Sequence, residues 1–102
     1  MTTFDEREHA FENKFARDAE LEFVAEAARN KLIAYWAAEL LGKSAADAAQ
    51  YAKEIIHLDF MTAGHEDVVN KLVADLGALS DEATVRAKMS EFLLDARKKV
   101  KG

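Results

Sequence analysis

The stretch AELEFVAEAARNKLIAYWAAELLG, residues 19–42, decides the fold of this chain. Its apolar residues recur every three or four positions, which is the spacing of one face of an α-helix. Gly42 follows the last of them and is expected to end the helix as a left-handed C-terminal cap. We therefore predict a helix over 19–41 whose inward face consists of Leu21, Val24, Ala25, Ala28, Leu32, Tyr35, Trp36 and Leu40.

Three further helices are predicted, because each start carries a capping or acidic residue. Ser44 with Asp47 begins the second helix, which stops near Gly64; Glu66 and Asp67 begin the third, which Gly77 closes; Ser80, Asp81 and Glu82 open the fourth. The predicted inward faces are Ala48, Ala52, Ile55, Ile56 and Phe60, then Val69, Leu72, Val73 and Leu76, then Val85, Met89, Phe92, Leu93, Ala96 and Val100. Short spacers make successive helices antiparallel neighbours, so the predicted fold class is all-α, a four-helix bundle.

The composition agrees with this fold class and excludes several others. With 102 residues, 50% hydrophobic and 32% charged, the chain has the size and balance of one small globular domain. It contains no proline and four glycines, whereas sheets and their turns normally use more of both. The absence of cysteine excludes disulfides and thiolate metal sites. A formal charge of −5 argues against a general nucleic-acid binder.

The N-terminal segment, residues 1–18, differs from the rest of the chain. Thr3 and Glu6 have capping-box spacing, which predicts a helix start near Phe4. The large apolar residues of the segment are Phe4, Phe11 and Phe15, which lie close to one line along a helix. A stripe that narrow buries little surface, so we expect a partly helical or mobile segment.

Two interpretations of this phenylalanine stripe stay open. It folds back onto the bundle, or it serves as a helix that binds in the groove of a partner. Burying three phenylalanines contributes about 5–9 kcal/mol, whereas ordering the backbone of the segment costs roughly 15 kcal/mol or more. If the segment binds a partner, the remaining binding free energy must come from charge pairs through Arg7, Lys14 and Arg17 or from a partly preformed helix.

No constellation for catalysis or metal binding is present in the sequence. The serines do not lie on a nucleophile elbow, and no glycine-rich phosphate loop occurs. His9, His57 and His65 stand on three separate segments without a partner at helical spacing, which favours structural roles. We expect no enzymatic activity, no metal site and no required cofactor.

Aromatic and basic residues on the helices allow a few weaker interpretations. Tyr35 and Trp36 are expected in the core or at its rim. Arg29 and Lys31 could contact a phosphate as point charges, although a solvated helix face explains them as well. The last residues of the chain are rich in positive charge. We expect them to stabilise the C-terminal end of the fourth helix through its dipole, and the alternative is that they bind an anionic partner. These residues are Arg97, Lys98, Lys99 and Lys101.

Several motifs together resemble the alphaproteobacterial zeta-subunit family, inhibitors of ATP hydrolysis by ATP synthase. They open with FDERE at 4–8, AFE at 10–12, KFA at 14–16 and DAEL at 18–21. They continue with ARNKL at 28–32, WAAELLG at 36–42, YAKE at 51–54, DF at 59–60 and EDV at 66–68. The resemblance covers essentially the whole chain, and the motif that ends at Gly42 is its most specific part.

The resemblance implies an N-terminal inhibitory segment over 1–18 and a four-helix bundle over 19–102. In this family the segment enters the interface between the alpha and beta subunits, against gamma, and blocks rotation in the hydrolysis direction. The matching positions here are Phe4, Arg7, Phe11, Lys14, Phe15 and Arg17. The family is also associated with ATP or ADP as a regulatory ligand on the bundle, for which Arg29 and Lys31 are a physical guess.

We expect the protein to lie in the cytoplasm, at the periphery of the inner membrane through its binding to ATP synthase. We expect it neither to bind nucleic acid nor to insert into the membrane. The alternative is an adenine-nucleotide-sensing helical module that acts on another partner.

Overall fold

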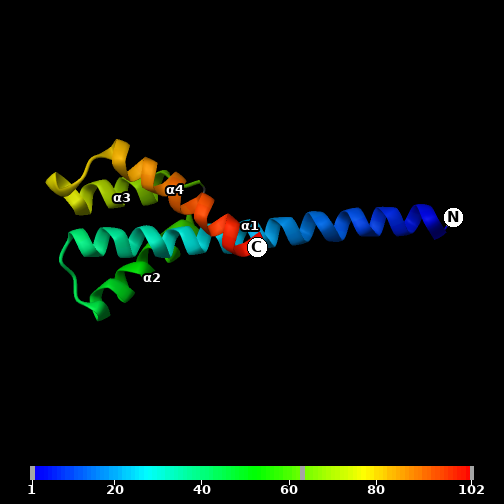
Figure 1. Cartoon of the computed structure of the whole chain (residues 1–102), viewed down its shortest axis with the longest axis horizontal. Helices are drawn as coiled ribbons and strands as arrows, with labels where there is room; N and C mark the ends of the chain where they lie inside the picture. The colour runs from blue at the N-terminus through cyan, green and yellow to red at the C-terminus, as the bar shows by residue number, and fades with distance from the viewer. Residues whose placement is uncertain (1, 63, 102) are drawn as a thin grey trace.

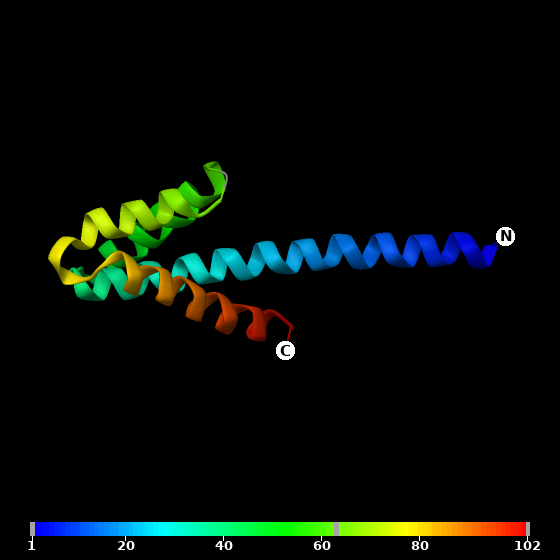
Figure 2. The ribbon, with the colours of Figure 1, turned by 90° about the horizontal axis from the view of Figure 1, so that it is seen from above.

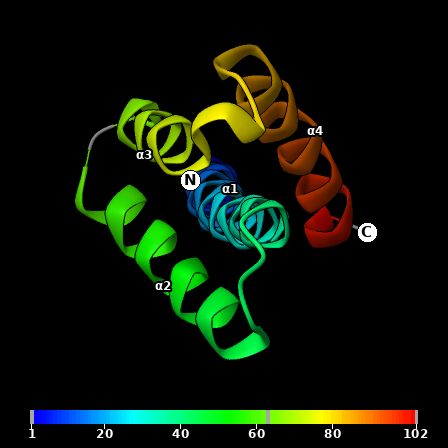
Figure 3. The same ribbon diagram turned by 90° about the vertical axis from the view of Figure 1, so that its left-hand side faces the viewer.

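The computed structural model describes residues 2–62 and 64–101, with side chains described at 19–62 and 64–100. Within that part of the chain lie four α-helices: α1 (Thr2–Leu40), α2 (Ala45–Met61), α3 (Glu66–Leu76) and α4 (Glu82–Lys101). A short 3-10 turn, η1 (Gly77–Leu79), joins α3 to α4. The predicted fold class, an all-α four-helix bundle, is confirmed. Seen end-on, α1 lies between the other three helices (Figure 3).

The helix α1 is longer than the stretch from which it was predicted. Its backbone is helical from Thr2, so the N-terminal segment runs without interruption into the helix expected from Ala19. The part of α1 before Ala19 extends past the ends of the other helices (Figures 1 and 2). At 1.5 Å per residue this part is about 25 Å long. The molecule is therefore elongated, with principal extents of 63 × 25 × 24 Å.

The turn after α1 has the geometry predicted from Gly42. This glycine has a φ of 72°, in the left-handed region that favours residues without a Cβ. The amide of Lys43 donates to the carbonyl of Ala38 at 3.0 Å, and the amide of Gly42 donates to the carbonyl of Glu39 at 3.1 Å. These two bonds form a Schellman motif, which satisfies the last carbonyls of α1 and turns the chain toward α2.

The predicted N-cap of α2 is confirmed, and that of α4 lies one residue later than expected. The amide of Asp47 donates to the Ser44 hydroxyl at 3.2 Å, which satisfies one free amide of the first turn. For α4, the amide of Thr84 donates to the Asp81 carboxylate at 2.7 Å. Hydrogen bonding from the Thr84 backbone lowers the pKa of Asp81. Asp81, rather than Ser80, is therefore the N-cap residue of α4, which begins at Glu82.

The inward face predicted for α1 is partly wrong. Val24, Tyr35 and Leu40 are 51%, 39% and 40% exposed, while Trp36 packs at the rim of the core, as expected. Ala25 is buried, as predicted, and the other buried apolar residues of α1 are Ile33, Ala34, Ala37 and Ala38, which were not predicted. A central helix is covered on several sides, so its buried surface is wider than one stripe. Alanines at those positions let α2 and α4 approach closely.

The faces predicted for α2, α3 and α4 are mostly confirmed, with Phe60 as the clear exception. Phe60 is 70% exposed and lies in the last turn of α2. Tyr51 takes a place in the core, and its hydroxyl donates to the Asp75 carboxylate of α3 at 2.8 Å. Burial, with added effect from Asp75, raises the pKa of Tyr51 well above its usual value. The remaining core residues of these helices are Ala48, Ala52, Ile55, Val68, Val69, Leu72, Leu76, Val85, Met89 and Ala96.

We predict that Leu72→Ala lowers the free energy of unfolding by about 2–5 kcal/mol, because it leaves a cavity in the centre of the core. The matched control is Leu94→Ala, which removes the same atoms from a side chain that is 57% exposed. The control should change stability by less than about 0.5 kcal/mol. Urea unfolding followed by circular dichroism measures both, and equal effects would contradict the described core.

Candidate functional site

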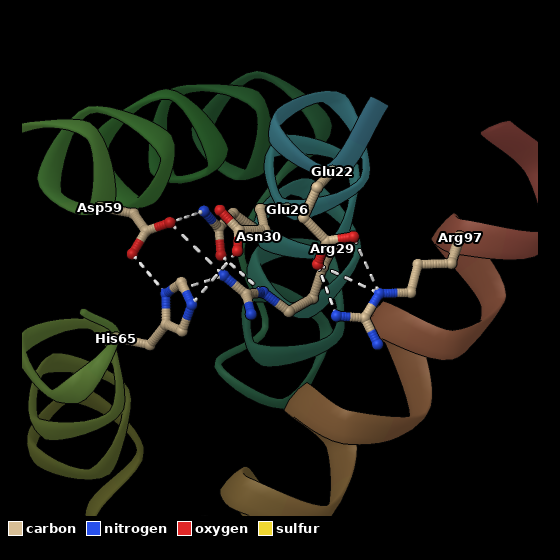
Figure 4. A network of polar contacts seen from close by, with 7 residues as sticks. All are labelled: Glu22, Glu26, Arg29, Asn30, Asp59, His65 and Arg97. Atoms are coloured by element: carbon tan, nitrogen blue, oxygen red, sulfur yellow. Dashed lines mark hydrogen bonds and ion pairs between the residues drawn. The ribbon is translucent and has the colours of Figure 1, made fainter. Parts of the chain in front are cut away.

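A polar network lies on α1 just inside the bundle, where the helix leaves the cover of its neighbours. Arg29 and Asn30 are each only 2% exposed, and they are the buried polar residues among the described side chains. The Arg29 Nε donates to the Asn30 Oδ1 at 3.0 Å, and the Asn30 Nδ2 donates to the Asp59 Oδ2 at 2.7 Å. Figure 4 shows these side chains converging from α1 and α2. The Asn30–Asp59 hydrogen bond joins α1 to α2.

Asp59 is also the ion-pair partner of Arg29. The Arg29 Nη2 lies 3.4 Å from the Asp59 Oδ2, and the two side chains are 2% and 10% exposed. Burial lowers the pKa of the Arg29 guanidinium, while the charges of Asp59 and Glu26 raise it. Arginine keeps its proton under such conditions, so the guanidinium remains a cation that needs its carboxylate.

His65 brings the start of α3 into the same network. Its Nδ1 lies 2.9 Å from the Asp59 Oδ1 and 3.1 Å from the Arg29 Nη2. Its Nε2 lies 3.6 Å from the Glu26 Oε1 on α1. His65 occupies the N-cap position of α3, but its side chain makes no capping hydrogen bond there. The ring instead connects α3 to α1 and α2.

A second polar contact joins α4 to α1 one turn further out. The Arg97 Nε lies 3.1 Å from both carboxylate oxygens of Glu22, and its Nη2 lies 2.5 Å from the Glu22 Oε1 (Figure 4). Hydrogen bonds to Glu22 raise the pKa of the Arg97 guanidinium. Arg97 therefore makes a specific contact within the bundle, whereas Lys98 and Lys99 are exposed.

A pocket of about 670 Å³ opens beside the network, between α1, α2 and the start of α3. Phe23 and Phe60 form an edge-to-face pair at its rim, with centroids 6.4 Å apart and ring planes at 78°. Both rings are mostly exposed, at 56% and 70%. The other lining residues are Glu26, Ala27, Asn30, Lys53, Ile56, His57, Asp59, Thr62, Gly64 and His65. Large exposed aromatic side chains beside a pocket are typical of a binding surface.

The structure separates the two residues predicted for nucleotide binding. Arg29 is buried, so the solvated-face interpretation is wrong for it, while Lys31 is exposed. Residues two apart point in directions about 200° apart around a helix, so the two cations do not converge. Their assignment to a nucleotide stays a prediction. The side chains of Phe4, Arg7, Phe11, Lys14, Phe15 and Arg17 lie outside the described residues.

Sequence reasoning missed the network itself. Asp59, Glu26 and Asn30 were not singled out, and His65 was given only a structural role. One signal was available, because Asn30 precedes Ile33, Ala34 and Ala37 at helical spacing and so lies on the core face of α1. An amide on a core face needs hydrogen-bonding partners. Their identity depends on residues about thirty positions away, which no local pattern shows.

The residues whose side chains the structure describes contain neither a membrane span nor a metal centre. No helix among them is long and apolar enough to cross a membrane. No group of three or more histidine, aspartate or glutamate side chains among them is placed to hold a metal ion.

The fold and site define a small all-α protein with a polar network and an open pocket where its longest helix leaves the bundle. Residues 1–99 match the family described as ATPase inhibitor subunit zeta, so the chain belongs to that family. A structure solved by NMR in solution is 46% identical, with a TM-score of 0.71, over 78% of this chain and 94% of the other. No match was found among curated proteins. The family resemblance read from the sequence is confirmed.

We predict that Asp59→Asn lowers the free energy of unfolding by about 3 kcal/mol, because it leaves the Arg29 cation buried without its carboxylate. Asp95→Asn makes the same chemical change on the exposed side of α4 and should leave stability close to that of the wild type. Urea unfolding measures both variants. Equal stabilities would show that the ion pair contributes nothing.

Proposed function

We propose that this chain inhibits ATP hydrolysis by ATP synthase through the N-terminal segment of α1. Membership of the inhibitor family supports a regulatory role at the synthase. The observation that supports this mechanism is the helical backbone of α1, whose part before Ala19 extends past the other helices. This part is about 25 Å long at 1.5 Å per residue. A helix that leaves its own bundle in this way can enter a groove of a larger partner.

In this proposal, residues 1–18 are the inhibitory segment and residues 19–102 are the bundle that carries it. The segment binds between the alpha and beta subunits and against gamma, and so blocks rotation in the hydrolysis direction. Phe4, Phe11 and Phe15 supply apolar anchors on one helical line, and Arg7, Lys14 and Arg17 supply charge pairs. A helix formed before binding lowers the entropy cost of ordering the segment. The chain acts without catalysis of its own, in the cytoplasm at the membrane face that carries the synthase.

We predict that replacing Phe4, Phe11 and Phe15 together by alanine removes most of the inhibition of ATP hydrolysis by the purified synthase head. Each lost ring forfeits about 1.5–3 kcal/mol of burial in the complex. Hydrolysis is measured against increasing amounts of added protein, and a variant that starts at Ala19 tests the whole segment. Leu94→Ala is the control for an exposed apolar residue on α4. Undiminished inhibition by the chain that starts at Ala19 would contradict the proposal.

A second function, binding of ATP or ADP as a regulatory ligand, is favoured by the pocket beside the network. Its volume of about 670 Å³ lies within the range of small-molecule sites. The Phe23 and Phe60 rings offer apolar faces to an adenine base, and Lys53 in the lining offers a cation to a phosphate. An adenine-nucleotide-sensing module acting on another partner would use the same pocket.

We predict that titration with ATP or ADP shifts the backbone amide resonances around this pocket in a saturable way. Lys53→Ala should weaken binding about tenfold, because a hydrogen bond to a charged group is lost. Lys31→Ala is the matched variant on α1, outside the pocket lining. A loss of affinity in Lys31→Ala but not in Lys53→Ala would move the site to the residues predicted from the sequence. Scattered shifts without saturation would remove the nucleotide function.

A further inference from the structure

The end of the bundle from which α1 projects carries an exposed pair of aromatic rings. Phe23 of α1 and Phe60 in the last turn of α2 lie edge to face, with ring centroids 6.4 Å apart. Their side chains are 56% and 70% exposed. Phe23 follows Ala19 by four residues, which is about 6 Å along a helix. The pair therefore lies within a short distance of the part of α1 that extends past the other helices (Figures 1 and 2).

The width of the bundle limits how far α1 can enter a partner. A single α-helix with its side chains is about 10–12 Å across, whereas the molecule measures 25 × 24 Å across its long axis. The end of α2, the start of α3 and the end of α4 all lie at the end of the bundle from which α1 projects (Figure 2). A groove that fits the projecting part of α1 is therefore too narrow for the bundle. The bundle stops at the mouth of such a groove, with this end against the partner.

From this geometry we propose that Phe23 and Phe60 form a second contact with ATP synthase. Their partner is an apolar patch on the synthase surface, beside the mouth of the groove that receives residues 1–18. This inference rests on the proposed function, because the inserted segment sets where the bundle stops. Aromatic anchors supply much of the binding energy of protein interfaces. The two rings already contact each other in the free chain, so less entropy is lost when a partner covers them.

The first experiment measures inhibition of ATP hydrolysis by the purified synthase head with full-length chains. The double variant Phe23→Ala/Phe60→Ala should need about tenfold more protein for half-inhibition, because the complex loses the burial of two rings. The control is Leu79→Ala, which removes a side chain that is 54% exposed in η1, at the opposite end of the bundle (Figure 2). This control should inhibit like the wild type. Unchanged inhibition by the double variant would overturn the inference.

The aromatic pair also borders the pocket proposed for ATP or ADP, so a further variant separates the two roles. Lys53 lines that pocket and is the cation proposed for the nucleotide phosphate. Lys53→Ala should therefore weaken nucleotide binding and leave the inhibition of the synthase unchanged. If Lys53→Ala weakened inhibition as much as Phe60→Ala does, the rings would act through the nucleotide, and the second contact would be wrong.

Photochemical crosslinking tests the contact without relying on the strength of inhibition. With p-benzoyl-phenylalanine in place of Phe60, the full-length chain should crosslink to a subunit of the synthase head on illumination. The same group in place of Leu79 should not. A crosslink between two copies of this chain would assign the surface to self-association and overturn the inference. The absence of any crosslink from position 60 in an inhibited complex would overturn it as well.

The variant that lacks Phe4, Phe11 and Phe15 distinguishes failure of this inference from failure of the proposed function. Inhibition that is lost in that variant but unchanged in the double variant of the aromatic pair leaves the proposed function in place and removes only the second contact. Inhibition that survives loss of the three phenylalanines contradicts the inhibitory segment itself. The position of the bundle then has no basis, and the second contact falls with it.

Discussion

A buried guanidinium must keep a carboxylate within reach, and this constraint organises the part of the molecule that surrounds Arg29. Removing a charge from water costs several kcal/mol unless a counter-charge and hydrogen bonds replace the lost hydration. Asp59 supplies the counter-charge and Asn30 supplies a further bond. Because Asp59 lies near the end of α2, this requirement fixes the distance between that end and α1. It also sets where the chain turns back toward α3, which starts beside His65.

At the same end of the bundle, α1 passes from the packed core into the part that projects from it. From Ala25 to Ala38 the helix has fully buried residues, and small alanines allow its neighbours to approach closely. Before Ala19 its backbone continues without a neighbouring helix in either view (Figures 1 and 2). One helix therefore serves as the central element of the core and as a projection from it. The Glu22–Arg97 contact with α4 lies between these two parts.

The fold was predictable to the extent that it is encoded locally. Gly42 and Ser44 gave the end of α1 and the start of α2, because a left-handed cap and a hydroxyl cap depend on only a few neighbouring residues. The inward face of α1 was not predictable in the same way. A single apolar stripe assumes one covered side, whereas α1 lies between the other helices, so alanines became core and Val24 became surface. Position within the bundle, not periodicity, decided that face.

The site was less predictable than the fold, because its members come from three helices. Asn30 carries a local signal on the core face of α1, but its pairing with Asp59 and the approach of His65 are products of packing. Polar contacts between helices restrict the relative position of the helices more than apolar contacts do. An apolar contact tolerates rotation and sliding of two helices, whereas a hydrogen bond between named atoms does not. The network at the base of the projecting helix therefore fixes how α2 and the start of α3 are placed against α1. A substitution that breaks these hydrogen bonds therefore acts on the fold at the point nearest to the projection.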